Sequence, residues 1–298
     1  MQFIRRAFLQ SITRPKIISY PFSSLNLRGK FFLKKYKCHS GAFVISFAWF
    51  SQARKEENES EKLKLQLLTL VDNLYKQNKF REVYDLLVEH KNCDDVEILW
   101  RLSRVQYNIS QEFATNPEER KVLIFEAYKI ISKSLALDEN HFANHKWMSI
   151  LLDARSIYYG IKARISNLEV VKEHLLKAAE LNPKDATTLY MLGYWCYEIT
   201  NMPWYQRKIA SMIFTTPPTS TFEEALEYFN KAEEVEPRFY SHNLLMLGKT
   251  YLKLNKEDQA RYYLDLACNY PISTDDDILA NKEACDLLMK LTPKKISI

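Results

Sequence analysis

Glycine is scarce in this chain: the 298 residues include only 5, and these are isolated from one another. A phosphate-binding loop needs clustered glycines and a nucleophile elbow needs a GxSxG pattern, and neither pattern is present. The same scarcity disfavours turn-rich sheets, while 47% hydrophobic residues are enough to bury a sizeable core. The composition therefore predicts an all-helical protein, and it gives no support to catalysis or to a cofactor.

The cysteine pattern lacks any CxxC pair. The five cysteines are Cys38, Cys93, Cys196, Cys268 and Cys285, and two of them, Cys196 and Cys268, lie inside apolar helical patterns. Cysteines placed in this way behave as small hydrophobic residues. We expect core thiols in a reducing compartment.

Metal-ligand patterns are also sparse. His141 and His145 are four residues apart on an expected helix, a spacing that can hold a metal ion, but no further His, Cys or acid completes a set such as HExxH. Trp147 beside them is more typical of packing. The sequence predicts no metal site.

Acidic residues are absent from the first 55 residues. This stretch holds 11 Lys/Arg, whereas the rest of the chain holds 31 Lys/Arg and 37 Asp/Glu, so the two parts carry +11 and −6. Residues 1–14 place Ile4, Phe8 and Ile12 on one helical face and basic residues on another. Such a helix is typical of a mitochondrial targeting segment, and a plain disordered basic tail is the alternative. We therefore expect residues 1–55 to form a basic leader that is mostly disordered.

The apolar run at residues 42–50 is too short to cross a membrane, because a spanning helix needs about 20 residues. Lysines precede the run and Trp49 lies within it. The segment either lies in a membrane interface or belongs to a poorly ordered leader. The long basic region before it disfavours a secretory signal.

An internal repeat is the main pattern that the sequence does contain. The stretches HLLKAAELNPKDATTLYMLG from His174 and YFNKAEEVEPRFYSHNLLMLG from Tyr228 both run from a helix through a proline into a second helix. Pro237 and Pro271 are 34 residues apart, which is the tetratricopeptide period, whereas Pro183 and Pro237 are 54 apart. One repeat unit therefore carries about 20 additional residues.

The charged run at residues 54–64 is expected to be a linker that turns into helix, and helical periodicity divides the region from about residue 61 onward into about five helix pairs. A terminal helix that begins at Asp275 caps the last pair, with acids at the positive end of its dipole. The sequence thus predicts an all-α, tetratricopeptide-like solenoid over residues 56–292, followed by a tail at 293–298. The expected pairs are 63–75 with 83–88, 96–113 with 118–137, 143–159 with 168–181, a pair around Gly193 and Ala225, and a pair around Gly248 and Ala260.

Small residues mark the closest approach of the two helices in a pair. Gly193 and Ala225 are 32 residues apart, whereas Gly248 and Ala260 are 12 apart, which is the uninterrupted spacing. A larger side chain at these positions would push the helices apart. The residues that we expect to define the repeat are Gly193, Ala225, Ala232, Pro237, Gly248 and Ala260.

The insertion at residues 201–221 reads NMPWYQRKIASMIFTTPPTST. It can form a short helix over 203–214, with apolar side chains near one side and Arg207 and Lys208 near another, ended by the Thr-Pro-Pro stretch. The insertion either projects, to close over a groove or to touch an acidic or membrane partner, or packs on its own solenoid as an extra layer.

Aromatic and basic residues gather in the third and fourth units. Most of the aromatic residues are expected to fill the core, although tyrosines on a concave wall also suit a peptide or an acyl chain. Basic residues around the insertion suit acidic tails or phosphate headgroups, and a solvated face is the alternative. The residues predicted to bind a partner are Lys146, Trp147, Tyr158, Lys162, Arg164, Trp204, Tyr205, Arg207 and Lys208.

Six segments carry a further signal. They are HFANHKW from His141, YGIKARISN from Tyr159, KEHLLKAAELNPKDAT from Lys172, MPWYQRKIA from Met202, FTTPPTSTFEEALEYF from Phe214 and LLMLGKTYLKL from Leu244. Together they resemble the regulator of microtubule dynamics family, and in particular its short mitochondrial member. The resemblance spans residues 63–291 and includes the insertion as well as the generic repeat.

The resemblance implies a non-enzymatic scaffold that associates with microtubules, spindle poles and mitochondria, in the mitochondrion and the cytoplasm. It implies tubulin or other proteins as partners, brings no catalytic residues, and does not include nucleic acid. The alternative is a lipid-binding or membrane-contact tethering module at the mitochondrial surface. Because the repeat region carries a net negative charge, microtubule binding must rely on a local basic patch.

Overall fold

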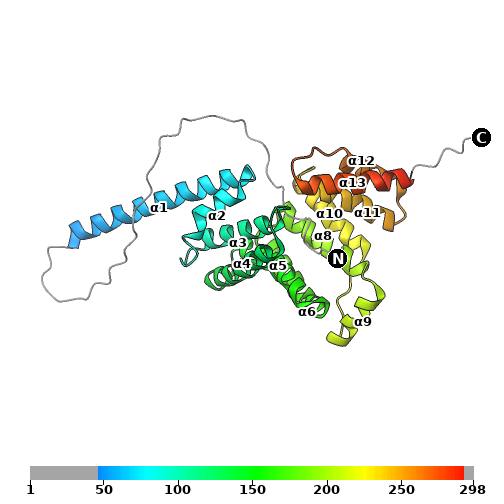
Figure 1. Ribbon diagram of the computed structural model, residues 1–298, viewed down its shortest axis with the longest axis horizontal. Coiled ribbons are helices and arrows are strands. Elements are labelled where there is room, and N and C mark those ends of the chain that lie inside the picture. Colours follow the sequence, from blue (N-terminus) through cyan, green and yellow to red (C-terminus); the bar gives the residue numbers. More distant parts are fainter. Residues whose placement is uncertain (1–45, 292–298) are drawn as a thin grey trace, which may run out of the picture. The chain divides into compact units, whose positions relative to one another are not determined.

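The computed structural model describes residues 46–291 (Figure 1). The proposed targeting helix, residues 42–45 of the apolar run and the tail at 293–298 lie outside these residues. Within them all regular structure is helical, no strand occurs, and no helix is long and apolar enough to cross a membrane. The predicted all-α, tetratricopeptide-like fold is therefore confirmed.

The helices follow one another with short connections. In chain order they are α1 (Ser46–Lys76), α2 (Phe80–Val88), α3 (Val96–Gln111), α4 (Pro117–Leu137), α5 (Phe142–Ser156), the 3-10 turn η1 (Ile157–Tyr159), α6 (Ile161–Ser166), α7 (Leu168–Leu181), α8 (Ala186–Thr200), α9 (Trp204–Ile213), α10 (Phe222–Val235), α11 (Ser241–Lys253), α12 (Glu257–Cys268) and α13 (Asp275–Leu291).

The described chain divides into two units, residues 46–72 and residues 73–291. Helix α1 begins at Ser46 and runs without a break through the charged stretch at 54–64, so the expected helix is present there but the expected linker before it is helical as well. Residues 46–55 are likewise helical rather than disordered. The stretch is rich in Glu, Lys, Gln and Leu and contains no glycine or proline, and these residues favour helix more than the charge run suggests.

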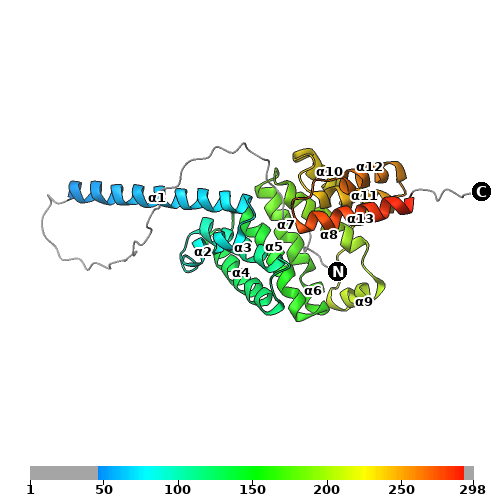
Figure 2. The same cartoon turned by 45° about the horizontal axis from the view of Figure 1, so that its top comes forward.

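The unit at residues 73–291 contains four of the five predicted helix pairs. Contacts join α3 with α4, α5 with α7, α8 with α10, and α11 with α12, and α13 packs against α11 and α12 (Figures 1 and 2). The first helices of successive pairs also touch, α3 with α5 and α8 with α11. Each pair thus buries its apolar face on the next, as a solenoid requires.

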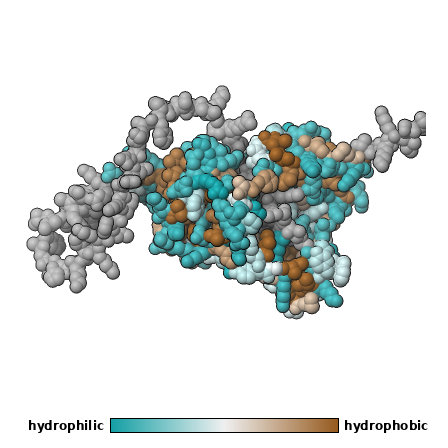
Figure 3. All heavy atoms as spheres, viewed as in Figure 1, coloured by the Kyte–Doolittle hydropathy of each residue, from teal (hydrophilic) through white to brown (hydrophobic). Residues whose placement is uncertain are grey.

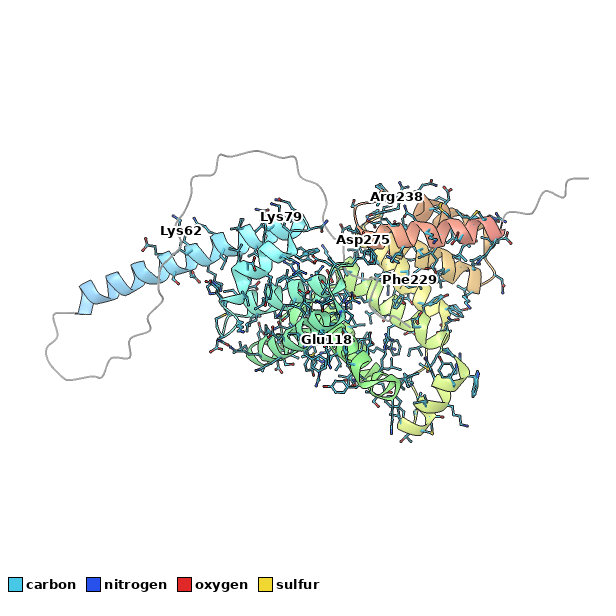
Figure 4. All side chains as sticks on the ribbon, in the orientation of Figure 1. Lys62, Lys79, Glu118, Phe229, Arg238 and Asp275 are labelled. Atoms are coloured by element: carbon cyan, nitrogen blue, oxygen red, sulfur yellow. A yellow bond between two sulfur atoms is a disulfide. The ribbon has the colours of Figure 1, made fainter. Side chains whose placement is uncertain are left out.

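Gly193 lies where α8 and α10 come closest. A Cβ atom there would sit 2.7 Å from the Phe229 ring and 3.1 Å from the Ala225 carbonyl oxygen. Phe229 is fully buried on α10 (Figure 4). The predicted close approach of Gly193 to the helix that carries Ala225 is therefore confirmed.

The other repeat-defining positions have matching roles. A Cβ atom added to Gly248 would lie 2.6 Å from the Leu264 side chain on α12. Ala225, Ala232 and Ala260 are fully buried. Helix α10 ends two residues before Pro237, which cannot continue it.

The capping helix α13 is anchored by its first acids. Asp277 is buried and accepts hydrogen bonds from the Ser241 hydroxyl at 2.7 Å and the Thr274 backbone N–H at 3.0 Å. Asp276 accepts one from the Tyr240 hydroxyl at 3.0 Å. These carboxylates fix α13 to α11 as well as complementing the helix dipole.

Two cysteines contradict the expectation of core thiols. Cys268, at the end of α12, forms a disulfide with Cys285 of α13, with the Cα atoms 5.0 Å apart. The packing of α13 on α12 brings the two side chains together although they are 17 residues apart in sequence. Cys196 does remain a buried thiol, and burial raises its pKa to about 11.

Candidate functional site

Two insertions emerge from neighbouring repeat units. The turn η1 and helix α6 lie between the two helices of the third unit, and α9 lies between the two helices of the fourth. Because equivalent loops of successive repeats fall at the same edge of a solenoid, the insertions meet, and α6 contacts α9 (Figures 1 and 2). We call residues 157–166 and 202–214 together the α6–α9 extension.

Local sequence explains where both segments begin. Gly160 precedes α6 with φ of +88°, in the region that favours glycine. Pro203 precedes α9 in an extended conformation with φ of −60°, which its ring already favours. Thr215 and Thr216 then bend the chain away before Pro217, so α9 stays short.

One face of α9 packs on the protein. Gln206 and Ala210 are buried, and Ile209, Ile213 and Phe214 lie partly buried against the main hydrophobic core. Through this face the insertion packs on its own solenoid as an extra layer, which is one of the two alternatives that the sequence left open.

The opposite face of α9 is exposed. Trp204, Lys208 and Met212 follow one another at intervals of four residues and so share one side of the helix. Trp204 is 76% exposed and Met212 is 71% exposed. In the space-filling view hydrophobic side chains gather over α9 (Figure 3). These exposed apolar side chains make this face a candidate interaction surface.

Aromatic residues continue this surface onto η1. Tyr159 is exposed, and its ring centroid lies 5.8 Å from that of Phe125. Tyr158 also packs on Phe125, at 5.7 Å. Arg155 lies over the Tyr128 ring at 4.3 Å and donates to the Tyr159 hydroxyl at 3.1 Å. The tyrosines are thus held in place by α4 and α5 while their outer edges face solvent.

The extension contains no acidic residue. Neither residues 154–168 nor residues 199–222 include Asp or Glu, whereas each stretch carries lysine and arginine. In a repeat region with an excess of acid, this edge is therefore the basic one.

The two arginines of the extension are committed to the fold. Arg164 makes two hydrogen bonds to the buried Asp153 carboxylate, at 2.9 and 3.0 Å. Burial raises the pKa of Asp153, and the guanidinium opposes that rise. Arg207 donates to the backbone oxygens of Met202 at 2.9 Å and Thr200 at 2.8 Å, which satisfies carbonyls at the end of α8.

Two lysines have no such role. Lys162 and Lys208 are exposed, and the ammonium group of neither forms a hydrogen bond or an ion pair with another residue in the part of the chain that the structure describes. These ammonium groups are therefore available to an acidic partner.

Two of the predicted partner-binding residues lie inside the protein instead. Lys146 is buried, and its Nζ contacts both carboxylate oxygens of Asp185, at 3.0 and 3.1 Å. Burial alone would raise the pKa of Asp185, but Lys146 and Thr188 bring it below its usual value. Trp147 is fully buried, with its ring 5.9 Å from Tyr107. The surface is left to Tyr158, Lys162, Trp204, Tyr205 and Lys208.

His141 and His145 contact different partners. His141 contacts Glu97 at 3.0 Å, and His145 Nδ1 lies 2.9 Å from His174 Nδ1. Among the residues that the structure describes, no group of three or more His, Cys, Asp or Glu is arranged to hold a metal ion.

The sequence analysis does not predict the contact between α6 and α9. Helix α6 has only six residues, too few for a periodic pattern, and its anchor Asp153 lies on the preceding helix. The shared lack of acid at 154–168 and 199–222 is the signal that could have connected the two insertions.

Comparison with known proteins decides the family. The family model described as regulator of microtubule dynamics protein 1-3 matches residues 67–292. The chain belongs to the regulator of microtubule dynamics family. It is 44% identical to regulator of microtubule dynamics protein 1 of Mus musculus over 279 residues, which covers 94% of this chain and 86% of the mouse protein.

Other members of the family are similar over shorter stretches. Regulator of microtubule dynamics protein 1 of Homo sapiens is 49% identical over 195 residues, or 65% of this chain and 62% of the human protein. Regulator of microtubule dynamics protein 3 of Xenopus laevis is 37% identical over 66% of this chain and 43% of its own length. The match of 67–292 to the family model includes both insertions, so the extension lies within the family region.

The fold comparison agrees with the repeat. A tetratricopeptide protein of Thermus thermophilus superposes with a TM-score of 0.51 at 16% identity, covering 74% of this chain and 98% of the bacterial one. At that identity the likeness shows the helical-repeat fold alone.

Proposed function

We propose that this family member is a non-enzymatic scaffold that binds microtubules directly through the α6–α9 extension. The observation that supports the proposal most is the pairing of two exposed lysines, Lys162 and Lys208, with exposed aromatic side chains on an edge without acid. Tubulin's acidic tails supply the complementary charge. The name of the family points to the same class of partner.

The two kinds of side chain have different roles in such a contact. Lysines on an exposed edge attract an acidic partner and raise the association rate, but each exposed ion pair adds only about 0–1 kcal/mol. Aromatic residues such as Trp204 and Tyr205 supply apolar area that excludes water when covered, and interface energy concentrates on residues of this kind. Binding should therefore depend on salt through the lysines and on contact area through Trp204.

Co-sedimentation of the full chain with microtubules over a salt series tests direct binding. We expect binding at low ionic strength that weakens between about 50 and 300 mM salt, because the Debye length shortens. A chain that stays in the supernatant even at low salt would show that any link to microtubules is indirect.

We propose the mitochondrion and the spindle pole as places where the scaffold acts, on the basis of the basic amphipathic pattern at residues 1–14 and of the family resemblance. A fluorescent reporter fused to residues 1–50 tests the targeting role. A reporter spread evenly through the cytosol would remove it.

A second candidate function is docking to a membrane surface. It is favoured by the line of Trp204, Lys208 and Met212, since a helix with exposed Trp and Lys also suits a membrane interface. Flotation of the chain with anionic vesicles separates the candidates. Binding to vesicles but not to microtubules, with the vesicle binding lost in Trp204→Ala, would favour the membrane.

A further inference from the structure

The segment between α9 and α10 carries five hydroxyl groups, and two of them have structural roles. The Ser220 hydroxyl donates to the Glu224 carboxylate at 2.6 Å. The Thr221 hydroxyl oxygen accepts from the Glu224 backbone N–H at 3.1 Å and so caps α10. These groups help to start the helix and are not free for other chemistry.

Thr216 is the threonine of this segment that directly precedes a proline. It is exposed, lies in a bend outside any helix, and forms no side-chain hydrogen bond with the residues that the structure describes. Pro217 and Pro218 follow it directly, and a residue before proline is restricted to extended conformations. Thr216 therefore presents its hydroxyl on an accessible stretch outside the helices, where Pro217 disfavours the helical conformation of its backbone.

We propose that Thr216 is a phosphorylation site for a proline-directed Ser/Thr protein kinase, and that the phosphate switches off partner binding by the α6–α9 extension. Extended substrate backbone suits a kinase cleft, and proline at the next position fixes the chain and offers no N–H that would have to be satisfied. The second half of this inference rests on the proposed function.

The reaction transfers the γ-phosphoryl group of ATP to Thr216. The bond between the γ-phosphorus and the bridging oxygen to the β-phosphate breaks, and a bond from phosphorus to Thr216 Oγ1 forms. The kinase's base takes the hydroxyl proton, and ADP leaves. No oxidant or reductant is needed.

Charge explains the expected effect. The insertion at residues 201–221 has two positive side chains, Arg207 and Lys208, and no negative one. A phosphothreonine adds about −1.5 to −2 charges at pH 7, which cancels both. Thr216 lies three residues beyond Ile213 at the end of α9, a span of at most about 11 Å, so the phosphate stays close to the helix.

The position of the phosphate adds to this effect. A helix carries partial negative charge at its carboxyl end, so a phosphate just beyond Ile213 is also unfavourable for the last turn of α9. Met212 lies in that turn and belongs to the exposed surface. Phosphorylation should therefore weaken both the charge and the apolar part of the contact.

The test uses the full chain with Thr292→Ala, because Thr292–Pro293 is the other Thr-Pro pair in the sequence. The chain is incubated with a purified proline-directed kinase, ATP and Mg²⁺, and phosphate is located by peptide mass mapping. We expect one phosphate on Thr216, absent when Thr216→Ala is added. Phosphate on other residues with Thr216 unmodified overturns the site, and so does a chain that takes up no phosphate.

Microtubule co-sedimentation of the modified and unmodified chains then tests the switch. We expect phosphorylation to lower the affinity for microtubules on the order of fivefold, which is the effect of losing one charge contact at the rim of an interface. Kinase treatment of Thr216→Ala should leave the affinity unchanged. Equal binding with and without phosphate overturns the switch. If the unmodified chain does not bind, the proposed function and the switch fail together, while the mapped phosphate still decides the site.

Discussion

The guanidinium of Arg164 makes two hydrogen bonds to the carboxylate of Asp153 and ties α6 to α5. Both side chains are nearly enclosed, since 11% of Arg164 and 5% of Asp153 remains exposed. This pair sets the direction in which the α6 half of the extension leaves the solenoid.

Replacing Arg164 with alanine should destabilise the protein by about 3–5 kcal/mol, because it leaves the Asp153 carboxylate buried without its partner. Urea denaturation followed by circular dichroism measures the change. Lys162→Ala, on the same short helix but exposed, is the matched control and should shift stability by less than about 0.5 kcal/mol. Equal effects of the two variants would contradict the account of α6.

Gly193→Ala should destabilise by about 1–2 kcal/mol. Overpacking against the Phe229 ring costs about 1–3 kcal/mol, and the better helix propensity of alanine returns up to about 1 kcal/mol. Adding Phe229→Leu should make the Gly193→Ala change less harmful than it is alone, which a double-mutant cycle would reveal. Strict additivity would show that Gly193 is not a point of contact.

Stability should fall as the pH drops below about 6.5, through the pair of His145 and His174. Burial and the neighbouring His145 lower the pKa of His174 to about 4, whereas an unfolded histidine titrates near 6.5. Between these values the unfolded chain binds the proton and the folded chain does not, so each step down in pH favours unfolding.

Unfolding midpoints in urea between pH 7.5 and 5 measure this dependence. His174→Gln should flatten it. The measurements should stay above pH 5, because below it carboxylates also contribute to the pH dependence of stability. One of them is Glu97, whose pKa is lowered to about 2 in the folded protein by its hydrogen bond to His141. An unchanged pH dependence in His174→Gln would rule out this histidine as the cause.

The disulfide between Cys268 and Cys285 should stabilise the protein by about 3 kcal/mol, the value expected for a closed loop of this length. The double variant Cys268→Ser/Cys285→Ser should lower the free energy of unfolding by that amount, and wild type with reductant should match it. Alkylation under non-reducing conditions is the direct check. Modification of both cysteines would show that the bond is not formed.

The sequence predicted the solenoid well because its signals are local. Proline spacing, Gly193 and Gly248 all act within one helix pair, so each could be interpreted without knowing the rest of the fold. The sequence does not predict the start of α1 at Ser46, because the charged run suggests a linker although its residues favour helix.

The site was harder to predict because its features depend on tertiary contacts. Arg207 has the sequence pattern of a surface cation, but its guanidinium bonds the carbonyls of Thr200 and Met202 across the turn before α9. Cys268 and Cys285 pair only because α13 folds back on α12. Periodicity alone could not show which cations stay available, whereas packing leaves Lys162 and Lys208 exposed.

The central claim is that the α6–α9 extension is the surface that binds microtubules. Co-sedimentation of the full chain carrying Lys162→Glu/Lys208→Glu tests it most directly, with Lys121→Glu/Lys282→Glu as a control of equal charge change at exposed lysines elsewhere. We predict that the first pair weakens binding at least about tenfold and that the control changes it less than about twofold, as specific charge contacts require. Equal losses in both variants would show that net charge alone drives binding, and would contradict the claim.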